Sequence, residues 1–530
     1  MAIGALLAAS FLFLGARQQT EEDSQGALQR GMKAYRQGDF TAAIESFEAV
    51  LSRKPENVQA RFNLAGALHQ TGNAKQALEE ILKLEGKMKN RARYLSTLGQ
   101  IYAATGRLVE AQEALTESAE LRPEVARTHY WLGEVLASRG AQLGAIEKMQ
   151  EAARLHPRWA LPHGRMGELW HRLGSPGRAI ESLERAAELA PEASRILVPL
   201  GKAYALGGRH EDAVRALEKA LESTREMALV RALLADSLLA SGKTERAVTE
   251  YRTTVEQDPE NTGYRIELAE ALYLNEELEA ALTELEQVLV QEPQNGLVLY
   301  YIGVFEDELG QKAVARGHLE AAIALLESQP AKMDFRAGRG GESYPLRIAA
   351  QVKLAELLTE IQEHETAVAS LEAVVRAEPD HATAHYLLGL AYRVLGKREE
   401  ARRELNLFKQ INDAREHDQA AIIVLQRGDE QRAMEELQEA LRIYPADSVA
   451  HRRIARLLAK RGDPAAAMRH LELAIEARPS FVSPYTELMR LYCRYGHVER
   501  ARALLERARK DGLVLPGVCI EAEHTPDTGR

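Results

Sequence analysis

Cysteine is almost absent from this sequence, and its scarcity excludes proteins that depend on cross-links or on cysteine-bound zinc. Only Cys493 and Cys519 occur among the 530 residues. Two cysteines cannot supply a disulfide framework or a four-cysteine zinc site. Two alternatives stay open for them. They form one bridge that ties the C-terminal tail to the preceding helix, or they are two free thiols.

Aromatic residues and an excess of positive charge are also lacking. Aromatic residues make up 5% of the chain, whereas 45% of the residues are apolar and 28% are charged, with Ala, Leu, Glu and Arg dominating. These four are strong helix formers, so the composition favours an all-α fold. The formal net charge is −10, and binding of nucleic-acid phosphates requires a basic excess, so we expect no nucleic-acid partner.

Long apolar runs are missing except at the N-terminus. Residues 1–16 read MAIGALLAASFLFLGA, and a polar stretch follows from Arg17 to Ser24. The run is shorter than the roughly 20 residues of a membrane-spanning helix and is typical of a signal-peptide core. However, no Lys or Arg precedes it, and Leu14 stands where a small residue is preferred. We predict a signal peptide over 1–16 and a linker over 17–23, which implies a periplasmic or secreted protein. The alternative is an uncleaved segment 1–16 that anchors the protein to a membrane.

A repeat of 34 residues runs through most of the chain, which is too long to fold around one core. Glycine lies five residues before twelve of fourteen regularly spaced alanines, and proline lies twelve residues after nine of them. Glycine suits a left-handed turn between two short helices, and proline ends the second helix. The alanines are Ala43, Ala77, Ala111, Ala145, Ala179, Ala213, Ala247, Ala281, Ala315, Ala367, Ala401, Ala433, Ala467 and Ala501.

Two further columns indicate how the helices of one unit pack. Gly or Ala stands twelve residues before the alanine in thirteen of fourteen units, and a large apolar residue often stands four residues after it. The third unit, for example, combines Gly99, Ala111 and Leu115. Small residues on both helices let their backbones approach closely, and the large side chain lies one helical turn along the same face.

These columns resemble the tetratricopeptide repeat (TPR) family. The third unit reads Leu98-Gly99-x₂-Tyr102…Ala111-x₃-Leu115…Pro123, and the pattern extends over residues 24–515. The resemblance implies an all-α, right-handed superhelical solenoid of about fourteen helical hairpins. It also implies that the first helices of the hairpins line a concave groove, which binds peptides or partner proteins.

The register divides the array into two blocks. We expect nine units over 24–329, a glycine-rich insertion over 330–347 that serves as a mobile connector, five units over 348–515 and a disordered tail over 516–530. The unit near 382–413 is shortened, and the stretch QINDAREHDQ replaces its proline turn.

Candidate catalytic and metal-binding residues are few. Outside the repeats too little sequence remains for a catalytic domain, so we predict that the protein is not an enzyme and needs no cofactor or metal. His381 and His385 have a helical spacing that two metal ligands could use. Yet His385 holds the fourth position of its unit, as do His129, His163 and His451, so we interpret this column as packing residues with a polar tip.

Two specialised members of the family do not match the chain. The asparagine ladder of O-linked N-acetylglucosamine transferases needs Asn at the sixth position of successive units, and here other residue types follow Asn63 in that column. The carboxylate clamp of chaperone-binding co-chaperones needs Lys or Arg at the fifth position of its first unit and Asn at the ninth. Here these positions hold Leu28 and Met32.

The ninth position of each unit usually faces the groove in this family, and here its residues are sorted by charge. The middle units carry mostly acidic residues there, with Lys202 and Val304 as exceptions, and the last two carry arginine, with Arg452 on the same face. We predict a groove that is acidic in its middle and basic at its C-terminal end; the alternative is the ordinary charge of a solvated face. The candidate residues are Glu134, Glu168, Asp236, Glu270, Glu356, Arg452, Arg456 and Arg490.

The function that these features predict is a non-catalytic scaffold or adaptor with protein or peptide partners. An extended, curved array suits this role because each repeat contacts only its neighbours. The alternative is a docking subunit of an envelope enzyme complex, whose glycosyltransferase or protease is encoded separately.

Overall fold

The computed structural model describes residues 24–224, 227–328, 334–336, 343–510, 513 and 515. Its chain divides after Asp258 into two compact units, and each unit is described by itself below. The predicted signal peptide, the linker, most of the insertion, Cys519 and the predicted tail lie outside the described residues. Whether Cys493 and Cys519 form a bridge therefore stays an open prediction.

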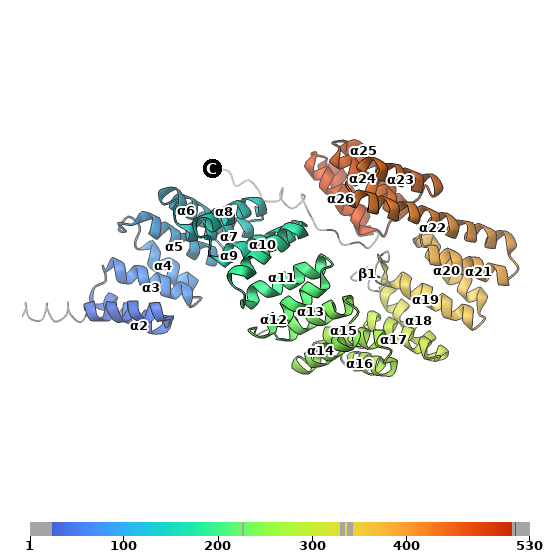
Figure 1. The fold of residues 1–530 in the computed structure, drawn as a ribbon, viewed down its shortest axis with the longest axis horizontal. Coiled ribbons are helices and arrows are strands. Elements are labelled where there is room, and N and C mark those ends of the chain that lie inside the picture. Colours follow the sequence, from blue (N-terminus) through green and yellow to red (C-terminus); the bar gives the residue numbers. More distant parts are fainter. Residues whose placement is uncertain are drawn as a thin grey trace, which may run out of the picture. The chain divides into compact units, whose positions relative to one another are not determined.

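The first unit consists of helical hairpins stacked in sequence order (Figure 1). It begins with a helix over residues 24–37. The helices that follow are α2 (Phe40–Arg53), α3 (Val58–Gln70), α4 (Ala74–Leu82), α5 (Arg91–Ala104), α6 (Leu108–Leu121), α7 (Ala126–Ser138), α8 (Gln142–Leu155), α9 (Ala160–Arg172), α10 (Pro176–Leu189), α11 (Ser194–Leu206), α12 (His210–Leu221), α13 (Met227–Ala240) and α14 (Thr244–Gln257).

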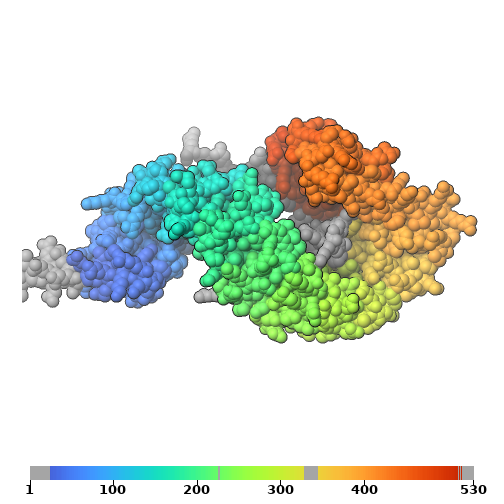
Figure 2. All heavy atoms as spheres, viewed as in Figure 1, coloured from blue at the N-terminus to red at the C-terminus, as the bar shows by residue number. Residues whose placement is uncertain are grey.

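The second unit continues the same arrangement with two irregularities, described below. Its elements are α15 (Thr262–Leu274), α16 (Leu278–Gln291), α17 (Gly296–Glu308), α18 (Lys312–Ser328), β1 (Asp334–Arg336), β2 (Ser343–Pro345), α19 (Leu346–Glu360), α20 (His364–Ala377), α21 (Ala382–Val394), α22 (Arg398–Gln426), α23 (Glu430–Ile443), α24 (Ser448–Lys460), α25 (Pro464–Ala477), α26 (Val482–Arg494) and α27 (Val498–Lys510). The space-filling view shows that successive segments lie side by side within each unit (Figure 2).

The alanine and glycine columns hold the two helices of each hairpin together, as predicted. Thirteen of the fourteen column alanines have no exposed surface, and Ala401 is 5% exposed. In the third hairpin, a Cβ atom added to Gly99 would lie 2.6 Å from Cγ of Leu115 and 3.1 Å from the carbonyl oxygen of Ala111. Only a residue without a side chain lets α5 and α6 approach this closely. The prediction of an all-α solenoid of hairpins is confirmed.

The turn between the helices of a hairpin needs a left-handed residue. All twelve predicted turn glycines have positive φ values, between 69° and 85°. In the two hairpins that lack this glycine, Glu276 and Gln362 adopt the same conformation, with φ of 63° and 66°. The stacking geometry therefore imposes the turn even where the residue disfavours it.

Both irregularities of the second unit lie where the register breaks. In the glycine-rich insertion, β1 and β2 pair as a short antiparallel ribbon, with Phe335 opposite Tyr344, which the all-α prediction did not include. At the shortened unit, α22 runs unbroken for 29 residues because no proline turn interrupts it. It thus supplies the second helix of one hairpin and the first helix of the next, since it packs on both α21 and α23. Among the described residues, no helix combines the length and apolar character needed to span a bilayer.

Candidate functional site

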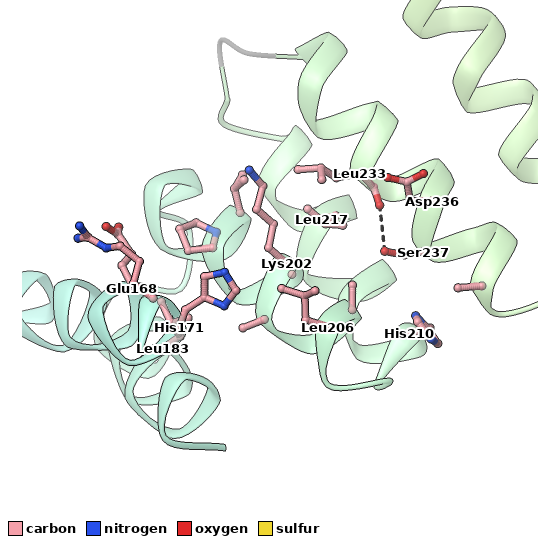
Figure 3. A pocket seen from close by; sticks show the side chains of 17 residues that line it. Glu168, His171, Leu183, Lys202, Leu206, His210, Leu217, Leu233, Asp236 and Ser237 are labelled. Atoms are coloured by element: carbon pink, nitrogen blue, oxygen red, sulfur yellow. Dashed lines mark hydrogen bonds between the residues drawn. The ribbon is translucent and has the colours of Figure 1, made fainter. Parts of the chain in front are cut away.

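A hollow of about 700 Å³ lies in the first unit, across the first helices of three consecutive hairpins. Helix α11 contacts both α9 and α13, so these three helices form a continuous wall. Leu206 and Leu233 contribute apolar surface to the hollow (Figure 3), and Pro199 also lines it. We call this hollow the apolar pocket.

Two residues of α11, Gly201 and Leu206, line the apolar pocket in different ways. Gly201 lies on the hairpin interface, where an added Cβ would be 2.6 Å from Cγ of Leu217, so this position presents no side chain. Leu206 ends α11 and keeps 66% of its surface exposed, although leucine is normally buried. An exposed leucine inside a concave, mostly apolar hollow is typical of a ligand-binding site.

Lys202 stands in the middle of the apolar pocket, with Glu168 on one side and Asp236 on the other (Figure 3). Glu168 is already engaged, because the guanidinium of Arg165 donates to its carboxylate. Asp236 accepts a hydrogen bond from the Tyr251 hydroxyl. Lys202 is exposed and forms no ion pair with any residue that the structure describes.

The pKa of the Asp236 carboxyl is shifted by its position in the wall of the apolar pocket. The protein atoms around its carboxylate displace water and raise the pKa of Asp236, and the hydrogen bond from Tyr251 opposes this effect without cancelling it. Within the described part of the chain, the pocket thus combines an apolar wall, an ammonium group without a counter-ion and a carboxylate whose charge is disfavoured. A partner that brings an apolar side chain next to an acceptor for Lys202 would match all three features.

Two family models, both described as tetratricopeptide repeat, match the chain along most of its length. One matches residues 34–101, 171–236, 424–485 and 458–512, and the other matches residues 96–158, 233–296 and 352–412. The chain belongs to the tetratricopeptide repeat family. No curated protein matches the sequence.

Solved structures of TPR proteins are similar to parts of the chain. YrrB, described as a TPR protein with an unusual peptide-binding site, is 22% identical over 34% of this chain and 94% of its own, with a TM-score of 0.31. The C-terminal part of a TPR protein from Cytophaga hutchinsonii is 21% identical over 45% of this chain and 97% of its own, with a TM-score of 0.39. A thermophilic TPR protein from Thermus thermophilus is 23% identical over 34% of this chain and 99% of its own, with a TM-score of 0.27.

The structure places the acidic ninth-position residues of the first unit on first helices of the TPR hairpins, as expected. Glu134 on α7 forms a two-pronged ion pair with Arg165 on α9, with N–O distances of 2.7 and 3.0 Å. Because Arg165 also binds Glu168, one arginine compensates two of the predicted acidic residues. Of the eight candidates, the apolar pocket brings together Glu168 and Asp236.

The remaining acidic candidates lie in the second unit. Glu270 on α15 is exposed, and the half-buried Glu356 on α19 has the Lys353 ammonium 3.8 Å from its carboxylate. Burial raises the pKa of Glu356.

The basic candidates at the C-terminal end are also partly compensated. Arg452 and Arg456 on α24 both bind Glu487 on α26, with Arg456 Nε 3.0 Å from each carboxylate oxygen. Arg490 on α26 is exposed. These compensating partners were not predicted, because the charges of the ninth position were not compared with the sixth position of the next TPR unit, which holds Arg165 and Glu487.

The histidine column has a structural role that the sequence pattern left undefined. Nε2 of His129, His385 and His451 each donates to the carbonyl of the proline six residues earlier, at 2.8, 2.9 and 3.1 Å. Each histidine therefore ties the first turn of a first helix to the preceding turn. His381 accepts a hydrogen bond from the Ala384 amide and so caps α21, and Nδ1 of His385 lies 2.6 Å from Glu404.

Proposed function

We propose that this TPR protein is a non-catalytic scaffold that binds an extended segment of a partner protein on the surface formed by its first helices. The apolar pocket of α9, α11 and α13 is the principal anchor in this proposal. The observation that carries it is the exposed Leu206 beside Lys202, which has no ion pair among the described residues.

The physical reason is the burial of apolar surface. A partner side chain that covers Leu206, Leu233 and Pro199 removes apolar area from water, which contributes about 25 cal/mol per Å². A single anchor of this kind gives modest affinity, and an array of hairpins can add further contacts along an extended segment. Such additive binding is the expected behaviour of a scaffold.

A charge at the anchor tests the proposal directly. We expect Leu206→Glu to abolish capture of partners from a native envelope extract, because it places a carboxylate in the apolar pocket. The matched control is Val290→Glu on α16, where an 83% exposed valine of the second unit receives the same change. Proteins captured by the wild type and by the control variant, but not by Leu206→Glu, support the proposal. Equal capture by both variants contradicts it.

The acidic character of the surface calls for a separate test. We propose that Glu134, Glu168 and Glu270 steer a partner with basic residues, and we expect their joint replacement by glutamine to weaken partner capture and to reduce its salt dependence. Since Arg165 already compensates Glu134 and Glu168, the ordinary charge of a solvated face stays the alternative. Unchanged capture and unchanged salt dependence would favour that alternative.

We also propose that the protein is exported, on the strength of the apolar run over residues 1–16. N-terminal sequencing of the natively expressed protein is the test. A mature N-terminus near Arg17 supports cleavage and export. An intact Met1 in the membrane fraction indicates the anchored alternative, and an intact Met1 in the cytosolic fraction contradicts both. A glycosyltransferase or protease activity that is captured together with the chain would indicate the docking-subunit role.

A further inference from the structure

We propose that the N-terminal hairpins carry a second binding site, which takes an acidic peptide segment in a pocket lined by arginines. This pocket has a volume of about 660 Å³. Phe47 of α2 and Ser118 of α6 contribute to it, but most of its lining residues come from the helix over residues 24–37, α3, α5 and α7. These last four are first helices, so the site lies on the same kind of surface as the apolar pocket. We call it the arginine pocket.

The charge of the arginine pocket is opposite to that of the chain. Arg36, Arg93, Arg122 and Arg127 line it, and no aspartate or glutamate does so among the described residues. Arg122 is compensated by Glu124, at 2.7 Å. Arg36, Arg93 and Arg127 are exposed and form no ion pair with the described residues. In a protein of net charge −10, three uncompensated arginines around one hollow are a local excess that an anionic partner can neutralise.

Two of these arginines line the pocket together with one tyrosine, Tyr35. Burial raises the pKa of the Tyr35 hydroxyl, and the positive charges of Arg127 and Arg93 act in the opposite direction. Tyr35 on the helix over residues 24–37, Arg93 on α5 and Arg127 on α7 all line the arginine pocket. Gly66 on α3 provides the space, because an added Cβ would lie 3.2 Å from the Tyr35 hydroxyl oxygen.

The orientation of the Arg93 guanidinium is restricted by the ring of Phe62. Its central carbon lies over the ring of Phe62, 4.8 Å from the ring centroid. A cation–π contact of this kind restricts the guanidinium and leaves its N–H edge able to donate. Less conformational entropy is then lost when a ligand binds.

The other polar groups of the arginine pocket suit a peptide. Asn63, Gln70 and Gln100 line it, and an amide side chain can both donate to and accept from a peptide backbone. Nδ1 of His69, another lining residue, is buried and has no hydrogen-bond partner among the described residues. The planar guanidinium fork matches a carboxylate with two parallel hydrogen bonds. The pocket thus offers carboxylate-binding groups together with groups that recognise an extended backbone.

A nucleic acid fits these features less well. Single-stranded nucleic acids are held by aromatic faces on which bases stack, along a basic groove that follows the phosphates. Here the ring of Phe62 is buried and already covered by Arg93, so it offers no free stacking surface. The site also differs from the carboxylate clamp, because the first-unit clamp positions hold Leu28 and Met32.

The test uses the whole chain and a short fluorescein-labelled peptide of alternating glutamate and alanine, with binding followed by fluorescence anisotropy at low salt. We expect saturable binding that weakens as salt is added. The double variant Arg93→Gln/Arg127→Gln should weaken binding by at least about tenfold, since two charge-assisted hydrogen-bond sets are lost. Both arginines are exposed, so we expect an unchanged thermal unfolding curve.

The control variant must remove the same net charge at positions outside the arginine pocket. Arg154→Gln/Arg215→Gln removes two exposed arginines of α8 and α12 in the same unit, and it should leave the affinity within about twofold. The same peptide with glutamine in place of glutamate should not bind. Equal weakening in both double variants, or binding of the glutamine peptide, overturns the proposal. Tighter binding of a single-stranded oligonucleotide overturns it as well.

The experiments can contradict one of the two proposed sites without contradicting the other. The arginine pocket and the apolar pocket share no lining residue. Leu206→Glu should therefore bind the glutamate peptide like the wild type, and Arg93→Gln/Arg127→Gln should still capture partners through Leu206. A Gly66→Ala variant adds a local readout, because its methyl group would displace the Tyr35 hydroxyl, 3.2 Å from the added Cβ, and should weaken peptide binding without removing any charge.

Discussion

The two compact units of the molecule use charged side chains in different ways. In the first unit, ion pairs join neighbouring hairpins through side chains that are partly or largely exposed, as between Glu134 and Arg165 or between Glu211 and Lys243. In the second unit, a buried ion pair joins Glu378 to Arg478, which are 100 residues apart, with an N–O distance of 2.9 Å. Arg478 is 1% exposed.

The surroundings of Arg478 explain how so large a cation is accommodated. Its guanidinium lies over the ring of Tyr344, 4.0 Å from the centroid. The Tyr444 hydroxyl donates to the carbonyl of Pro379 at 2.9 Å, and Ser448 donates to Asp380 at 2.8 Å. The turn over 378–380 is therefore held by residues from hairpins that do not follow it directly.

The difference follows from the repeat register. The first unit keeps the 34-residue register, and among its described residues no Asp, Glu, Lys or Arg is fully buried. In the second unit, α22 continues without a turn, and residues of later hairpins contact the turn over 378–380. Tyr444 binds Pro379 there, and Arg478 forms a buried ion pair with Glu378. Buried charges require such a set of partners, because removing them from water is costly.

Breaking the buried pair should give the largest effect. We expect Arg478→Met to lower the free energy of unfolding of the second unit by about 3–5 kcal/mol, because it leaves the Glu378 carboxylate buried without its counter-ion. Arg456→Met removes a pair whose arginine side chain is 57% exposed, and it should cost at most about 1 kcal/mol. Urea unfolding measures both variants, and similar losses would contradict the comparison. The double variant Glu378→Gln/Arg478→Met should recover part of the loss.

Overpacking the alanine column should have the next largest effect and should spread differently in the two units. Ala179→Leu and Ala433→Leu each introduce bulk at a fully buried contact and should cost about 1–3 kcal/mol. In the first unit we expect hydrogen exchange to accelerate only in hairpins next to α10. In the second unit the effect should reach the turn over 378–380, because α23 is followed by Tyr444, which binds Pro379. Uniform acceleration along the whole chain in either variant would contradict this expectation.

Introducing glycine at the two turns that lack it should increase the free energy of unfolding, by a smaller amount than the losses above. Glu276→Gly and Gln362→Gly relieve a left-handed conformation that costs an ordinary residue about 1–2 kcal/mol, and the greater freedom of glycine in the unfolded chain offsets part of the gain. We expect each variant to raise the free energy of unfolding by about 0.5–1 kcal/mol. The reverse change in the first unit, Gly242→Glu, should lower it by a similar amount. A loss of stability in either glycine variant would show that the side chain has a role of its own.

The smallest expected effect is a pH dependence at the C-terminal hairpins. Nδ1 of His451 lies 2.9 Å from Nδ1 of His470, and burial lowers the pKa of both. A histidine with a lowered pKa binds fewer protons in the folded than in the unfolded state, so stability should fall as the pH drops through the ordinary histidine pKa of about 6.5. Urea unfolding of the wild type and of His470→Gln on either side of that pH is the measurement. The variant should show the weaker dependence, and an equal dependence would exclude this pair as its source.

Much of the fold could be predicted from single columns of the sequence. Gly99, Ala111 and Leu115 stand at fixed positions of one repeat and touch one another in the structure, because a helical hairpin is specified by residues within one repeat. Gly38 and the other turn glycines likewise act on their own backbone. The ribbon of β1 and β2 was missed because a short strand pair carries little periodic signal.

The candidate site could be predicted only in part. Two of the ninth-position residues, Glu168 and Asp236, line the apolar pocket, but the ninth-position pattern showed neither this pocket nor the compensation of Glu134 and Glu168 by Arg165. Arg93 and Arg127 recur 34 residues apart, at the second position of their units, and this interval is the signal that could have revealed the arginine pocket.

By itself, the sequence determined that this chain is a TPR array, where each hairpin turns and which small residues let its helices touch. Those properties depend on backbone conformation and on contacts within one repeat, and the 34-residue period displays them directly. Only the tertiary structure decided which charges are compensated, which leucine stays exposed and which distant turns meet. Those outcomes depend on how neighbouring repeats stack. The sequence shows the shortened unit at α22, but it does not show which residues 100 positions apart meet as a result.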